Sequence, residues 1–137
     1  MSFVVDASVV LAWGFEDAGE YAVEVLEGLR STDAVVASLW PLEVTNGLLA
    51  AERRGRIEPA DARRFLHLLL SLPIVVDRVA TRHVFEATHA LARKHGLASY
   101  DAASLELAVR LGAPMATLDG PLLAAAEAEG LTLYTGG

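Results

Sequence analysis

The chain has 137 residues, of which 53% are hydrophobic and 21% charged, and its net charge is −7. This length predicts one domain spanning residues 1–137, and the apolar content suffices for a core, which excludes a disordered chain. The absence of cysteine excludes a disulfide scaffold, a thiol nucleophile and a Cys-based zinc or iron–sulfur site. Because no apolar stretch is long enough to cross a bilayer, we expect a soluble cytoplasmic protein without a membrane partner.

The charge is distributed unevenly along the chain. Residues 1–29 and 111–137 contain acids but no Lys or Arg, so every arginine and the single lysine lie between Arg30 and Arg110. Five arginines fall between residues 53 and 64. The acidic total argues against a nucleic-acid partner, because Lys and Arg hold a polyanion, but this local basic patch remains. Taken alone, the patch is typical of a solvated helix face.

Short apolar runs alternate with helical patterns from the N-terminus to the C-terminus, and no repeat or linker divides them. In chain order the patterns predict a strand over residues 3–5, a helix over 21–29, a strand over 34–37, helices over 41–54 and 59–70, a strand over 74–76, helices over 80–95 and 100–111, a strand over 115–118, a helix over 122–129 and a last strand over 131–134. Glycines are expected to end several of these helices. Short apolar strands separated by helices predict a parallel sheet covered on both faces, an α/β three-layer sandwich whose strand order the sequence does not give.

Four acids fall where an open α/β sheet binds ligands, beyond the carboxyl ends of its strands. Asp6 and Asp119 directly follow predicted strands, whereas Glu43 and Asp101 lie near predicted helix starts. Individually, Asp6, Asp101 and Asp119 are explained as N-caps or helix-dipole partners. As a set, the acids would repel one another unless a cation lay among them, and such oxygen ligands suit Mg²⁺ or Mn²⁺.

Small polar residues accompany these acids at spacings that keep them close: Ser8, Asn46, Ser104 and Thr117. Such side chains can orient a carboxylate or a metal-bound water, although Ser8 could instead cap a helix and Thr117 could simply fill a strand. Glu106 lies about 140° around the helix from Asp101 and is left out of the set. The four histidines have no metal-ligand pairing and are interpreted as surface or packing residues.

The segments that carry the acids resemble the four motifs of the PIN-domain ribonucleases. They are FVVDAS at residues 3–8, LEVTN at 42–46, SYDAASLELA at 99–108 and ATLD at 116–119. Chain length and motif order resemble the VapC-type toxins of toxin–antitoxin pairs, and the resemblance runs from Phe3 to the C-terminus. It implies a PIN-like three-layer α/β/α sandwich with a central parallel sheet, and a homodimer inhibited by a cognate antitoxin.

The resemblance also implies a catalytic site that cleaves RNA with a divalent metal held by Asp6, Glu43, Asp101 and Asp119. Independently of the resemblance, a carboxylate-bound Mg²⁺ or Mn²⁺ can activate water and neutralise charge on a phosphodiester. The arginine patch, in particular Arg53, Arg54 and Arg56, is a candidate contact for RNA phosphates.

Other protein classes fit the sequence less well. A receiver domain needs a lysine at a late strand end, whereas Lys94 lies in a predicted helix. A phosphatase with an aspartyl nucleophile usually carries a second acid two residues later, where this chain has Ser8. The alternative that stays open is a non-catalytic PIN-like protein that binds a basic partner or RNA through the acidic edge.

Overall fold

The computed structural model describes residues 2–136 and contains a four-stranded, fully parallel sheet in the order β3-β2-β1-β4. The register pairs Val4 of the central strand β1 with Val35 on one side and with Met115 on the other. This arrangement confirms the predicted parallel α/β sheet. The strands are β1 (Phe3–Val5), β2 (Ala34–Val36), β3 (Ile74–Val76) and β4 (Met115–Ala116).

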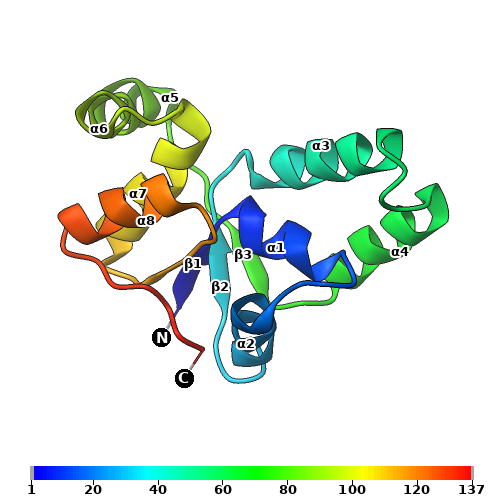
Figure 1. Cartoon of the computed structure of the whole chain (residues 1–137). Coiled ribbons are helices and arrows are strands. Elements are labelled where there is room, and N and C mark those ends of the chain that lie inside the picture. Colours follow the sequence, from blue (N-terminus) through cyan, green and yellow to red (C-terminus); the bar gives the residue numbers. More distant parts are fainter. Residues whose placement is uncertain (1, 137) are drawn as a thin grey trace.

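Helices cover both faces of the sheet, as Figure 1 shows. Along β1 the side chains alternate: Phe3 and Val5 belong to one hydrophobic core and Val4 belongs to the other. The first core includes residues of α1 (Ala7–Trp13), α2 (Glu20–Gly28), α3 (Trp40–Arg53) and α4 (Pro59–Leu70). The second includes residues of α7 (Ser99–Leu111) and α8 (Gly120–Ala128). The predicted three-layer α/β/α sandwich is therefore confirmed.

Two helices end at glycines in the left-handed conformation, as predicted. Gly96 follows α6 (His89–His95) with φ 65°, and Gly112 follows α7 with φ 62°. A residue with a Cβ is disfavoured at such angles, so the two glycines mark the helix ends already in the sequence.

The predicted helix over 80–95 is interrupted by a π-helical turn. It consists of α5 (Thr81–His83), the π-helical η1 (Val84–Thr88) and α6. A π-turn inserts one extra residue into a helical turn, and the apolar pattern of the sequence does not reveal it.

The predicted last strand over 131–134 is wrong. Only Leu133 forms a bridge, which is parallel and pairs it with Met115. The N–H of Met115 donates to the carbonyl oxygen of Thr132 at 3.0 Å, and the carbonyl oxygen of Met115 accepts from the N–H of Tyr134 at 2.8 Å. Because β4 has only two residues instead of the predicted four, the ladder cannot extend further. The ring of Tyr134 stacks on Phe3 instead, with centroids 3.8 Å apart.

Within residues 2–136, no helix combines the length and apolar character needed to cross a membrane.

Candidate active site

Asp6 occupies the position between the end of β1 and the start of α1. Its carboxylate does not cap the helix. Instead, Oδ1 accepts a hydrogen bond from Ser8 Oγ at 2.6 Å and Oδ2 accepts one from Thr117 Oγ1 at 2.9 Å. The residue is only 6% exposed, so the structure buries a carboxylate at the sheet edge and holds it with two neutral hydroxyl groups. The capping interpretation of Asp6 is therefore wrong.

The segment after β4 is tied to the same cluster. Thr117 Oγ1 accepts a hydrogen bond from the N–H of Asp119, and Ser8 Oγ accepts one from the N–H of Leu118, both at 3.0 Å. Asp119 Oδ1 accepts from the N–H of Leu122 at 3.1 Å, so this aspartate does cap its helix, α8. Since β4 ends at Ala116, a turn rather than a shared strand face brings Thr117 and Asp119 together.

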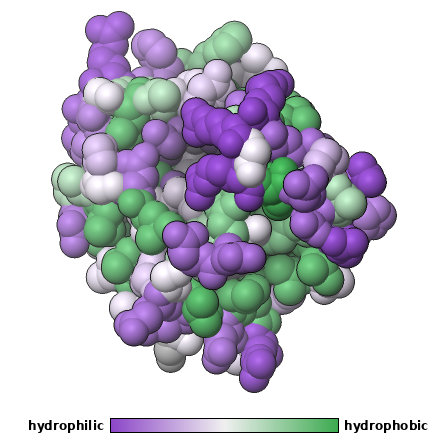
Figure 2. Space-filling model, turned by 45° about the vertical axis from the view of Figure 1, so that its right-hand side comes forward, coloured by the Kyte–Doolittle hydropathy of each residue, from purple (hydrophilic) through white to green (hydrophobic). Residues whose placement is uncertain are grey.

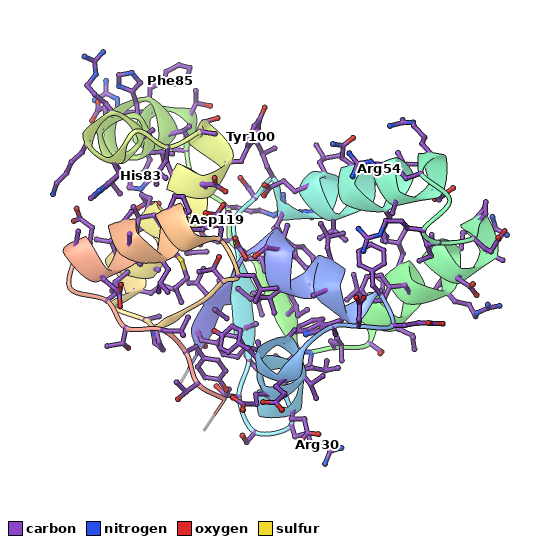
Figure 3. The ribbon with its side chains drawn as sticks, in the orientation of Figure 1. Arg30, Arg54, His83, Phe85, Tyr100 and Asp119 are labelled. Atoms are coloured by element: carbon purple, nitrogen blue, oxygen red, sulfur yellow. The ribbon has the colours of Figure 1, made fainter. Side chains whose placement is uncertain are left out.

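Glu43 and Asp101 lie in the first turns of α3 and α7, where the helix dipole favours negative charge. Both side chains are partly exposed. Asn46 lies exposed one turn after Glu43, whereas Ser104 is buried inside α7. The amino ends of α3, which follows β2, and of α7, which precedes β4, thus bring acids to the carboxyl edge of the sheet. Figure 3 shows Asp119 near the centre of the molecule, where α8 begins.

The four carboxylates influence one another electrostatically. Burial raises the pKa of Asp6 to about 6, and the charges of Asp101 and Asp119 add to the rise, against the hydrogen bonds from Ser8 and Thr117. Burial, followed by the charges of Asp101 and Asp6, raises the pKa of Glu43 to about 7. Burial and the charge of Asp119 also raise the pKa of Asp101. A cation at this edge would relieve the repulsion.

The chemistry of this donor set fits a hard divalent cation, because all four predicted ligands are carboxylates. Across residues 2–136, however, no three His, Asp or Glu side chains are gathered closely enough to form a complete metal site. Like charges repel, and the hydroxyl groups and the α8 cap hold Asp6 and Asp119 in separate hydrogen bonds.

The arginine patch lies at the other end of α3. Ten residues of helix separate Glu43 from Arg53, which corresponds to about 15 Å along the axis. Arg53, Arg54 and Arg56 are exposed, and the guanidinium of Arg56 lies 4.3 Å from the ring centroid of Phe15. The structure therefore does not bring these arginines into the carboxylate cluster. Figure 3 shows Arg54 at the far end of α3 from Asp119.

A second polar cluster surrounds Glu106, which lies on a different side of its helix from Asp101. Glu106 is 6% exposed and accepts two hydrogen bonds from Arg110, at 2.9 and 3.1 Å. Arg110 also donates to Asp77 at 2.7 Å, and His83 Nε2 lies 2.7 Å from Glu106 Oε2. This cluster was not predicted from the sequence, although the i,i+4 spacing of Glu106 and Arg110 indicates their ion pair.

Another missed residue is Tyr100, which directly precedes Asp101. Its side chain is 52% exposed and lines a surface cavity together with Glu43. The signal available in the sequence was an aromatic residue directly before a candidate catalytic acid.

Comparison with known proteins identifies the family. The family model described as PIN domain matches residues 3–132. The chain belongs to the PIN-domain family. This PIN domain is 32% identical over 126 residues to Ribonuclease VapC3 of Pyrobaculum aerophilum, a match that covers 89% of this chain and 92% of that protein. The resemblance to VapC-type PIN proteins is therefore confirmed.

Solved structures agree with this assignment. The crystal structure of PAE2754 from Pyrobaculum aerophilum superimposes with a TM-score of 0.72 at 25% identity, covering 93% of this chain and 86% of that one. FitAcB from Neisseria gonorrhoeae superimposes with a TM-score of 0.62 at 16% identity over 98% and 96% of the two chains, a similarity of fold alone.

Proposed function

We propose that this PIN domain is a metal-dependent endoribonuclease and the toxin of a VapBC-like toxin–antitoxin pair. The observation that carries the proposal is the electrostatic coupling of four carboxylates from separate segments at the carboxyl edge of the sheet. The similarity of this PIN domain to a protein named a ribonuclease supports RNA as the substrate. Asp6, Glu43, Asp101 and Asp119 would hold Mg²⁺ or Mn²⁺, which when bound supplies an activated water and neutralises phosphate charge.

The residues of the proposed site have different roles. Ser8 and Thr117 orient the Asp6 carboxylate through their hydroxyl groups, and Thr117 also fixes the backbone at Asp119. Glu43 and Asp101 approach from two helix ends and share the negative charge that a cation must balance. Asn46 and Ser104 are proposed as supporting residues, since each follows one of these acids by about one helical turn.

The test is RNA cleavage by the purified chain in Mg²⁺ or Mn²⁺, compared with cleavage in EDTA. We expect EDTA to abolish cleavage, and Asp101→Asn to abolish it without preventing folding. Asp61→Asn provides a matched control, because Asp61 lies on the exposed surface of α4. Cleavage that continues undiminished in EDTA would overturn the metal mechanism. Binding of RNA or a basic protein without any cleavage would instead favour the non-catalytic alternative.

The proposal includes two protein partners and a further RNA contact. A second copy of the chain forms a homodimer, and a cognate antitoxin inhibits the enzyme, as the family resemblance implies. Arg53, Arg54 and Arg56 hold RNA phosphates remote from the cut, because their separation from Glu43 along α3 excludes contact with the same phosphate.

A further inference from the structure

The exposed ring of Tyr100 sits next to the proposed catalytic carboxylates. Tyr100 and Asp101 are consecutive residues in the first turn of α7, so the helix fixes the ring relative to the acid. The ring packs into neither of the two hydrophobic cores. Figure 3 shows it projecting from α7 on the side where the N-terminal end of α3 lies. An aromatic residue left half-exposed beside a charged site is available to a ligand.

Tyr100 lines a surface cavity of about 430 Å³ that Glu43 also lines. Leu11, Leu39, Leu42 and Asn46 contribute to its walls, and Leu42 is 67% exposed. The lining is therefore mostly apolar, with one amide and one carboxylate. Gly47 lies in the same wall, where a Cβ would come within 2.5 Å of Leu11, so the glycine allows α1 and α3 to pack closely there.

We propose that this cavity is a nucleobase subsite, in which Tyr100 stacks on an unpaired base adjoining the phosphate that is cut. The inference rests on the proposed ribonuclease function and adds a contact to the base beside the cut. Glu43 belongs both to the cavity and to the carboxylate cluster, so an RNA strand whose phosphate reaches the cluster places a neighbouring base in the cavity.

The charge of the site supports this occupant. Carboxylates repel an RNA backbone, and the arginine patch lies about 15 Å away along α3. Stacking supplies affinity that does not depend on charge, and every base offers a flat face for it. Bases inside an A-form helix do not expose that face, so the base that Tyr100 contacts is an unpaired one. The Asn46 amide offers both a donor and an acceptor to a base edge.

The experiment first maps a cut made by the wild-type chain in cellular RNA. Short single-stranded RNAs spanning that cut are then made with an intact sequence and with an abasic sugar on either side. We expect Tyr100→Ala to raise KM about 5- to 100-fold, the range typical of losing one stacked base, with little change in kcat. Tyr100→Phe keeps the ring and should behave as the wild type. Phe85→Ala is the matched control, because Phe85 is 73% exposed and lies on η1.

The abasic RNAs separate stacking from a structural role. On one of them the wild type and Tyr100→Ala should become equal, because the stacking partner is gone. An unchanged KM for Tyr100→Ala on intact RNA would overturn the subsite and leave the cavity to an apolar side chain of a protein partner. An equal loss on intact RNA and on both abasic RNAs would also overturn it.

Failure of the proposed function has a different signature, namely no EDTA-sensitive cleavage by the wild type. The subsite is then decided by titrating a short RNA that carries 2-aminopurine, whose fluorescence falls on stacking. Quenching by the wild type that Tyr100→Ala loses supports the subsite. Equal quenching by both proteins, or quenching by neither, overturns it.

Discussion

Asp6 is a buried carboxylate whose hydrogen-bond partners are the hydroxyl groups of Ser8 and Thr117. The position of Asp6 follows from the sequence, because an acid directly after an apolar strand lies at the sheet edge. Its contact with Thr117 could not be predicted, because it requires β1 and β4 to be neighbours, and the sequence does not give the strand order. Because β1 and β4 are neighbours, Asp6 and Asp119, which the sequence shows only as separate acids after strands, lie in one cluster.

The raised pKa values of Asp6 and Glu43 predict how stability depends on pH without metal. These values are about 6 and about 7 in the folded protein, against 3.8 and 4.5 for the unperturbed groups. As pH rises from about 4 to 7, the unfolded chain loses these protons before the folded protein does. The free energy of unfolding should therefore carry a contribution that is present below about pH 4 and is lost as the pH rises through about 6 for Asp6 and about 7 for Glu43.

Urea denaturation in EDTA across this pH range measures the contribution. We expect the double variant Asp6→Asn, Glu43→Gln to gain stability relative to the wild type as pH rises. Asp17→Asn, in the exposed turn that follows α1, should follow the wild type. A constant difference between the double variant and the wild type from pH 4 to 7 would contradict the burial and coupling of these acids.

At the scale of elements, α7 connects the site to the rest of the fold. It begins with Tyr100 and Asp101, and it carries Glu106 and Arg110 toward its end. Burial acts to raise the pKa of Glu106, but the hydrogen bonds from Arg110 and the close approach of the His83 ring more than offset it and lower the pKa. Arg110 also reaches Asp77 just after β3, so this cluster ties α7 to the edge of the sheet.

Removing one partner of this cluster should cost more stability than removing two. Arg110→Met leaves the Glu106 carboxylate without its main partner, so this variant should be less stable than the wild type. Glu106→Leu combined with Arg110→Met replaces the pair by apolar groups and should cost less. Urea denaturation at neutral pH compares them, and a double variant less stable than the single variant would contradict this account.

Helices and strands were predicted correctly where the local sequence pattern is strong. The prediction was wrong where contacts between distant segments determine the secondary structure. Gly96 and Gly112 ended helices as expected because their left-handed backbone excludes most other residues. The strand expected over 131–134 became a single bridge, because its partner β4 has only two residues. The π-turn of η1 depends on how the helix packs, which apolar spacing alone does not encode.

At the scale of the whole molecule, charge and exposed apolar surface bear on the partners. Figure 2 shows hydrophobic side chains exposed among hydrophilic ones on one face. Large exposed hydrophobic residues occur on several elements, among them Leu68, Leu70 and Val75. Such surface is available for contact with a second copy of the chain.

The dimer prediction is tested by light scattering. We expect about twice the 14.5 kDa mass of the chain at micromolar concentration. A monomer under these conditions would count against the homodimer.

The arginine patch predicts a salt-dependent contribution to RNA binding. Replacing Arg53, Arg54 and Arg56 with Gln should weaken binding and reduce the slope of log affinity against log salt by up to about 2 for single-stranded RNA. Arg30→Gln is the control, because Arg30 is exposed and follows α2 rather than α3, as Figure 3 shows. An unchanged slope in the triple variant would return the patch to a solvated helix face.

The central claim is that the acidic edge of the sheet binds a divalent metal, and direct Mn²⁺ binding tests it. Titration followed by the electron paramagnetic resonance of free Mn²⁺ should show saturable binding to the wild type that Mg²⁺ displaces. Asp6→Asn and Asp119→Asn should each weaken that binding at least tenfold, whereas Asp61→Asn should not change it. Equal Mn²⁺ affinity in the wild type and in both edge variants would contradict the account.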